Sequence, residues 1–174
     1  MTLRNTPDSY GSLHKGLHWI MALLVLSQFI LAWMFTNIPK ENPLHGTLFQ
    51  WHVLIGVAVL ILVLFRIFWR TNNPEVLPLA ALSYLLRVAS QSVHLFLYVA
   101  MVLMPISGYL MVTGKGHAVT AFGLTIPALI NNPALANAGK VCHIYLAYFL
   151  LGAIVLHTIG AFVHKDLVVL KRML

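Results

Sequence analysis

The sequence has few of the residues on which soluble enzymes and nucleic-acid-binding proteins depend. Only 9% of the 174 residues are charged and only four are acidic, whereas soluble domains are about 25% charged. The single cysteine, Cys142, excludes an internal disulfide and a thiolate cluster. The chain is instead 60% hydrophobic. This composition predicts a membrane-embedded protein and argues against a nucleic-acid partner.

Four apolar runs divide the chain, and each is close to the length of about 20 residues that crosses a bilayer as a helix. They cover residues 15–36, 49–69, 90–113 and 141–163. Loops rich in helix-breaking residues separate them, and Pro105 with Gly108 predicts a kink in the third run. The sequence therefore predicts an all-α membrane protein in which residues 1–174 form one domain, a bundle of four transmembrane helices.

Basic residues gather in the segments that share one side of such a bundle. The N-terminus, the second loop and the C-terminus hold eight of the eleven Lys and Arg residues, and the first and third loops hold three. Basic residues in short loops mark the cytoplasmic side of a membrane protein. We therefore expect both termini in the cytoplasm, where anionic lipid is the partner of the positive charge.

Nine histidines stand against four acidic residues, and four of them fall at matched depths in the predicted helices. His143 and His157 are 14 residues apart in the fourth helix, about 21 Å of rise and nearly on one face. By depth, His52 in the second helix lies opposite His143, near the outer surface. His18 in the first helix lies opposite His157, near the cytoplasmic surface. His94 lies at the inner depth too and is an alternative to His18.

Two imidazoles that face each other from different helices can be the axial ligands of one haem iron. The two pairs thus predict two haems, one near each membrane surface, with His18, His52, His143 and His157 as ligands. Because the sequence has no Cys-x-x-Cys-His motif, the haems are expected to be b-type rather than covalently attached.

Several short fragments form a specific pattern when they are taken together. They lie at residues 5–11, 17–19, 51–56, 93–95, 105–109, 122–127, 142–143 and 156–157. With this pattern, nearly the whole chain resembles the bacterial di-haem cytochrome b-561 family. The resemblance implies haem ligands at His18, His52, His143 and His157, in agreement with the depth argument. It also implies an inner-membrane protein that exchanges electrons with the ubiquinone pool, and in some members superoxide is the donor.

The expected function is electron transfer across the inner membrane, from a periplasmic donor such as superoxide to ubiquinone near the cytoplasmic surface. His164 follows His157 by seven residues and faces the same side, so it is a candidate to hydrogen-bond the quinone, although an interfacial histidine would look the same. Three arginines are candidate partners of the haem propionates, although cytoplasmic topology alone also explains them. They are Arg66, Arg70 and Arg87. Three outer lysines are candidates to attract an anion such as superoxide: Lys40, Lys115 and Lys140.

Two other functions fit parts of the sequence. The chain has the features of a non-catalytic haem b subunit that anchors a dehydrogenase or hydrogenase and carries its electrons. A proton or metal transporter with a histidine relay is the third possibility. None of the four acidic residues lies within the apolar runs, which argues against a relay, because proton relays usually combine histidine with Asp or Glu.

Overall fold

The computed structural model describes residues 2–77, 83–163 and 173. Its four long helices are α1 (Ser12–Thr36), α2 (Pro43–Thr71), α3 (Tyr84–Thr113) and α4 (Pro133–Val163). Each has the length and apolar composition needed to cross a membrane. At about 1.5 Å of rise per residue, even the shortest exceeds the hydrocarbon thickness of about 30 Å. The predicted all-α bundle of four transmembrane helices is confirmed.

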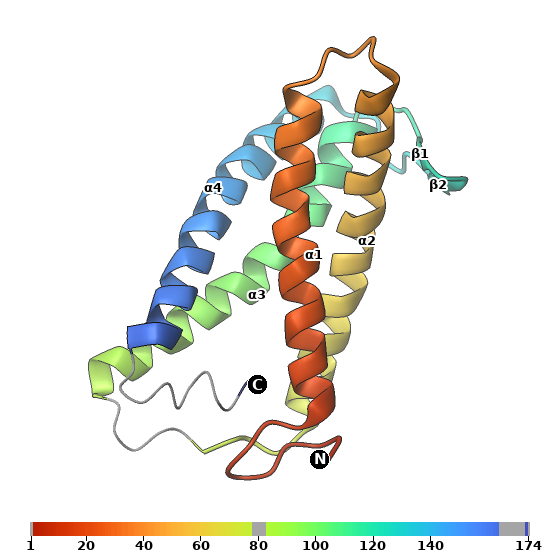
Figure 1. The fold of residues 1–174 in the computed structure, drawn as a ribbon. Helices are drawn as coiled ribbons and strands as arrows, with labels where there is room; N and C mark the ends of the chain where they lie inside the picture. The colour runs from red at the N-terminus through yellow and green to blue at the C-terminus, as the bar shows by residue number, and fades with distance from the viewer. Residues whose placement is uncertain (1, 78–82, 164–172, 174) are drawn as a thin grey trace.

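The helices associate as two antiparallel pairs. α1 packs along α2 and α3 packs along α4, and the two pairs cross obliquely, with α2 and α3 also in contact (Figure 1). The first residues of α1, the last residues of α4 and the connection from α2 to α3 lie at one end of the bundle, called here the lower end (Figure 1). The connections from α1 to α2 and from α3 to α4 lie at the opposite, upper end (Figure 1).

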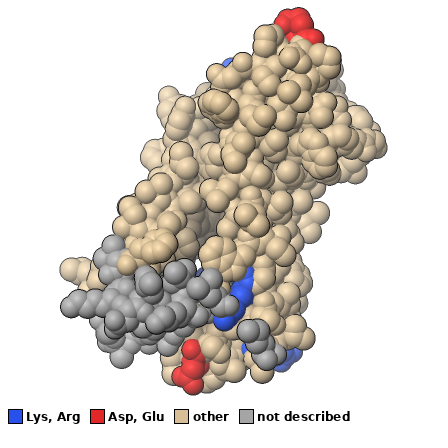
Figure 2. Space-filling view, in the orientation of Figure 1, with Lys and Arg blue, Asp and Glu red and all other residues tan. Residues whose placement is uncertain are grey.

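The middle of the bundle is held by a small apolar core to which every helix contributes one buried side chain. These residues are Val25, Val59, Ala100 and Leu150. Many large hydrophobic side chains instead lie exposed on the outer surface. Charged residues are confined to the two ends of the face seen in Figure 2, and the helical middle is uncharged. A belt of this kind, uncharged and apolar, matches the hydrocarbon layer of a membrane.

All four helices begin earlier than the apolar runs predicted, and an Asn-Pro pair starts two of them, α2 and α4. Asn42 accepts a hydrogen bond from the backbone N–H of Leu44, and Pro43 is the first residue of α2, six residues before the predicted start. Asn132 likewise accepts from the N–H groups of Ala134 and Leu135 at the start of α4. These capped first turns are polar or small, so hydrophobicity alone did not reveal them.

The connection from α3 to α4 contains a short hairpin of two antiparallel strands, β1 (Val119–Ala121) and β2 (Leu124–Ile126). Its turn places Phe122 at a φ of 47° and Gly123 at 82°. The Phe122 ring packs 4.7 Å from the Trp51 ring, and its backbone N–H donates to the side chain of Gln50. The hairpin is thereby attached to the upper end of α2.

Candidate functional site

Two of the predicted site residues, His52 of α2 and His143 of α4, face each other near the upper end of the bundle. Their ring centroids are 6.2 Å apart and the ring planes are inclined at 72°. Both rings are partly buried. The structure therefore brings together the two histidines that were predicted from the sequence to lie at the same depth near the outer surface. They are called here the upper pair.

The orientation of His143 is set by α3. Its Nδ1 lies 3.0 Å from the carbonyl oxygen of Met104 and 3.2 Å from the Ser107 hydroxyl oxygen. A Cβ atom added to Gly108 would lie 3.1 Å from Cε1 of the same ring, so glycine is what leaves room for it. Sequence reasoning missed these contacts. The signal available was the Pro105-to-Gly108 interruption, which was interpreted only as a kink.

His52 is held through its backbone rather than its ring. The Gln28 side chain donates a hydrogen bond of 2.9 Å from Nε2 to the His52 carbonyl oxygen. Gly56 lies beside this amide, because a Cβ atom there would be 3.4 Å from Gln28 Nε2. Within the described part of the chain, the buried Nδ1 of the His52 ring has no hydrogen-bond partner. A buried imidazole nitrogen without a partner is costly.

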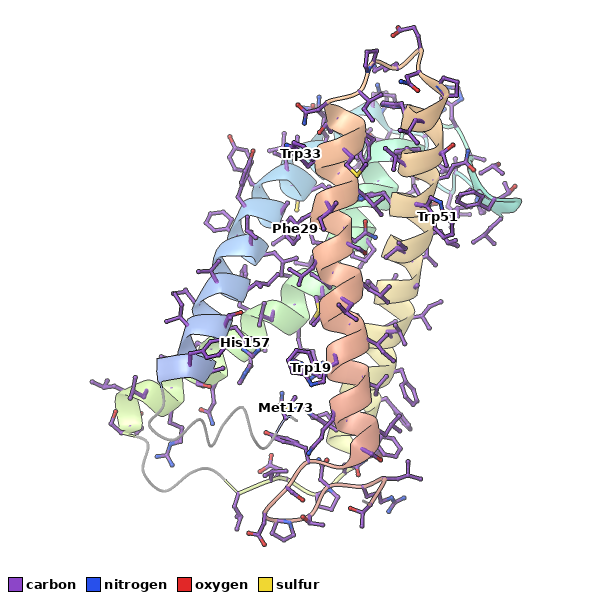
Figure 3. All side chains as sticks on the ribbon, in the orientation of Figure 1. Trp19, Phe29, Trp33, Trp51, His157 and Met173 are labelled. Atoms are coloured by element: carbon purple, nitrogen blue, oxygen red, sulfur yellow. The ribbon has the colours of Figure 1, made fainter. Side chains whose placement is uncertain are left out.

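Three histidines meet near the lower end. The rings of His18 and His157 are 6.0 Å apart between centroids, and those of His94 and His157 are 5.1 Å apart. Figure 3 shows His157 near the lower end of α4, on the side that faces α1. The pair predicted first, His18 with His157, and the alternative, His94 with His157, are thus both in contact. These three residues are called here the lower cluster.

A buried arginine adjoins the lower cluster. Arg66 is only 9% exposed, its Nη1 lies 3.2 Å from His18 Nδ1, and its Nε donates to the Tyr98 hydroxyl over 3.1 Å. Arg70 lies over the Tyr98 ring at 5.4 Å from the centroid. Both hydrogen bonds of the Arg66 guanidinium go to neutral groups, and no described residue gives it a carboxylate partner. An unpaired cation at this depth needs an anion to be stable.

The other predicted residues lie away from these contacts. Arg87 is exposed in the first turns of α3 at the lower end, and Lys40, Lys115 and Lys140 are exposed towards the upper end. His164 lies outside the described residues. In the part of the chain that the structure describes, no group of three or more His, Cys, Asp or Glu residues is placed to hold a bare metal ion.

Aromatic residues mark the two ends of the bundle. Figure 3 shows Trp33 and Trp51 towards the upper end and Trp19 towards the lower end. The Trp19 indole N–H donates to the carbonyl oxygen of Met173 over 2.9 Å. Tryptophan is enriched where a membrane meets water, so the levels of these rings fit the apolar belt between them.

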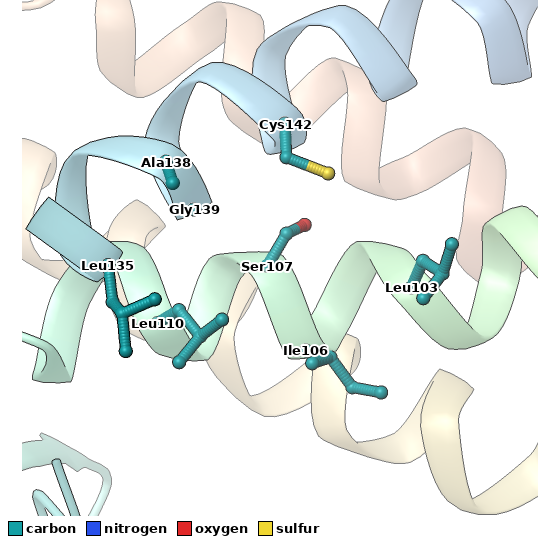
Figure 4. A pocket seen from close by; sticks show the side chains of 8 residues that line it. All are labelled: Leu103, Ile106, Ser107, Leu110, Leu135, Ala138, Gly139 and Cys142. Carbon is teal, nitrogen blue, oxygen red and sulfur yellow. The ribbon is translucent and has the colours of Figure 1, made fainter.

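A small apolar cavity of about 220 Å³ lies between α3 and α4 beside the upper pair. Ser107, Gly139 and Cys142 contribute to its lining, and Figure 4 shows Ser107 and Cys142 on opposite sides of it. The lining is otherwise aliphatic. No charged side chain lines this cavity, so it offers no partner to a polar ligand. We interpret it as a packing gap next to α3, the helix that orients His143.

Four helices that cross a membrane and hold facing histidines at two levels define a class, the multi-helix membrane cytochromes of the b type. Comparison with known proteins gives the family. Residues 9–174 match the model of the prokaryotic cytochrome b561 family, and the chain belongs to that family.

Two relatives align along nearly their whole length. Cytochrome b561 homolog 2 of Escherichia coli (strain K12) is 33% identical over 181 aligned positions, which cover 100% of this chain and 95% of the relative. The probable superoxide oxidase CybB of Yersinia pestis is 30% identical, over 94% of this chain and 95% of the relative. The predicted family is confirmed. The protein is a membrane cytochrome of the b type that binds haem b and functions in electron transfer.

Proposed function

We propose that this chain holds two haems b, one between His52 and His143 and one between His18 and His157. A metal–imidazole bond is about 2 Å long and each ring nitrogen lies about 1 Å from its ring centre, so two rings on opposite sides of one metal have centroids about 6 Å apart. The observed 6.2 and 6.0 Å support this assignment. When bound, each haem supplies one-electron redox chemistry.

The same distance argument favours His18 over His94 as the second ligand of the lower haem. His94 lies 5.1 Å from His157 between ring centroids, which is shorter than an intervening metal ion requires. We therefore assign His94 a role beside the haem and not on its iron.

His143 is prepared as a ligand by its hydrogen bond to α3. A carbonyl oxygen only accepts, so the bond to Met104 fixes the ring proton on Nδ1 and leaves the lone pair of Nε2 free. Ligating histidines usually donate their second nitrogen to such an acceptor, which orients the ring and raises its basicity. The hydrogen bond between His143 Nδ1 and the Met104 carbonyl is the single observation that supports the haem proposal most strongly.

Arg66 holds His18 in the opposite tautomer. Arginine has only donors, so His18 Nδ1 accepts and a neutral His18 carries its proton on Nε2. Ligation through Nε2 would place that proton on Nδ1, against the Arg66 donors. We therefore expect Arg66 to turn from His18 when the haem binds, which frees a buried cation to pair with a propionate. Arg70 and Arg87 are further candidates at the same end.

We propose that electrons pass from a donor at the upper, periplasmic surface to ubiquinone near the lower, cytoplasmic surface of the bacterial inner membrane. One relative is named a probable superoxide oxidase, and this supports superoxide as the donor. The exposed Lys40, Lys115 and Lys140 would attract such an anion to the upper end. We also propose His164 as a candidate to hydrogen-bond the quinone. We propose further that residues 1–174 form one domain.

The test mixes purified, oxidised protein with superoxide and follows haem absorption in a stopped-flow instrument, then adds decylubiquinone. We expect rapid reduction, re-oxidation by the quinone, and slower reduction when Lys115 and Lys140 are both replaced by Gln. Lys15→Gln, at the lower end, is the matched control and should leave the rate unchanged. Reduction only through a co-purifying protein would contradict the proposal and identify the chain as an anchoring subunit.

A further inference from the structure

A groove of about 470 Å³ lies between α2 and α3, near the lower end, and the haem proposal leaves it without a function. Polar side chains line one part of it, and aliphatic side chains line the rest. The polar residues are Arg70, Thr71, Gln91, His94 and Tyr98. The groove thus combines a hydrogen-bonding part with an apolar part within a membrane-spanning segment.

His94 connects this groove to the lower cluster. It lines the groove, and its ring lies 5.1 Å from that of His157. No hydrogen bond joins its ring to any other described residue. A histidine at membrane depth is costly without a partner and marks a functional site by default. The partner that fits is one that enters the groove.

Two more donors face the same space. The Tyr98 oxygen already accepts a hydrogen bond from Arg66 Nε, so its own O–H proton is free to donate. Gln91 is exposed to the groove and makes no side-chain hydrogen bond with a described residue. By contrast, the Thr71 hydroxyl already donates to backbone carbonyls of its own helix. His94, Tyr98 and Gln91 are thus the neutral donors that a ligand would meet.

We propose that this groove binds the headgroup of a quinone, with His94 and Gln91 as hydrogen-bond donors to its carbonyl oxygens. A quinone is flat, carries acceptors only and continues into an apolar tail, which matches donors at one part of the groove and aliphatic residues at the other. The proposal rests on the electron-transfer function above and deepens it, because it places the acceptor in contact with His94, the neighbour of His157.

An anionic lipid headgroup shares the combination of acceptors and an apolar tail. The groove has one arginine, Arg70, in its lining, while Arg66 lies outside the lining and is assigned above to a haem propionate. Phosphate groups are usually held by clusters of basic residues. A lining with one cation and three neutral donors therefore favours the uncharged quinone.

The test measures binding of decylubiquinone to the purified haem-loaded protein by isothermal titration calorimetry, together with the haem-to-protein ratio. We expect His94→Leu and Gln91→Leu each to weaken binding about three- to tenfold, the loss of one hydrogen bond, while both haems remain. His117→Leu, an exposed histidine of the connection from α3 to α4, is the matched control and should bind as the wild type does.

Unchanged quinone affinity in both groove variants would overturn the proposal. Loss of a haem in His94→Leu would also overturn it, because His94 would then be an iron ligand. A short-chain phosphatidylglycerol is the alternative ligand. If it displaces the quinone, and if the variants weaken its binding but not that of the quinone, the groove is a lipid site instead. Because binding is measured directly, quinone binding without haem reduction by superoxide would contradict the proposed donor and leave the groove assignment standing.

Discussion

At the scale of single residues, the two proposed ligand pairs differ in how hydrogen bonds prepare their histidine rings to bind iron. The His143 ring is fixed by the Met104 carbonyl in the tautomer that leaves Nε2 free. The His18 ring is engaged by Arg66 through Nδ1 and must be released. The upper site is therefore preorganised, whereas the lower site requires an exchange of partners.

Gly108→Ala tests the preorganised site. The added Cβ would lie 3.1 Å from Cε1 of His143, so the ring has to move by a few tenths of an ångström. We expect weaker binding or a shifted reduction potential of the upper haem, with the lower haem unchanged, in a redox titration followed by absorption. Gly152→Ala is the control, because a Cβ at Gly152 meets nothing within 4 Å. Equal titrations of Gly108→Ala and the wild type would contradict the role given to α3.

The positions of His18, His52, His143 and His157 could be predicted because helical rise converts residue number into depth. The choice between His18 and His94 could not be made from depth, since both lie at one level. Only the distances of their ring centroids from that of His157, 6.0 and 5.1 Å, distinguish them. The contacts of His143 with the Met104 carbonyl and with Gly108 could not be predicted from the sequence either. These contacts depend on how α3 turns against α4, and the sequence of one helix does not specify its rotation against another.

At the scale of the helices, close packing of α3 on α4 supports the upper pair. A Cβ at Gly139 of α4 would lie 2.9 Å from the Met111 backbone nitrogen and the Ser107 carbonyl oxygen. Backbone atoms cannot move aside as a flexible side chain can. Small residues that allow such approach are typical of helix pairs in membranes.

Gly139→Ala should therefore separate the two helices and destabilise the protein by about 1–3 kcal/mol, the usual cost of overpacking. Thermal unfolding of the purified protein in detergent would measure the loss, and the upper haem should be released first. Gly152→Ala lies on the same helix with open space around it and should unfold at the wild-type temperature. A Gly139→Ala protein as stable as that control would show that the close approach is not needed.

The helices were predictable in number because their apolar runs are long, but their first turns were not. The Asn42 and Asn132 caps add polar turns to α2 and α4 that hydrophobicity omits. The hairpin of β1 and β2 was not predicted either. Its strands have three residues each, and its position depends on the contact between Phe122 and Trp51.

At the scale of the whole molecule, the arrangement of the helices has a consequence for its orientation in the membrane. Five of the eight described basic residues lie at the lower end: Arg4, Lys15, Arg66, Arg70 and Arg87. In a Cys142→Ser background, we expect Lys40→Cys to react with a membrane-impermeant maleimide in intact cells whose outer membrane is permeabilised. Glu75→Cys, at the lower end, should react only after lysis. The reverse labelling pattern would contradict a cytoplasmic lower end.

The central claim is that four histidines hold two haems at two depths. The most direct test is the haem-to-protein ratio combined with a redox titration, for the wild type and for Ala variants of His18, His52, His143 and His157. We predict two haems in the wild type. His52→Ala and His143→Ala should lose the same redox transition, and His18→Ala and His157→Ala should lose the other. A wild type with one haem, or any of the four variants retaining both, would contradict the account.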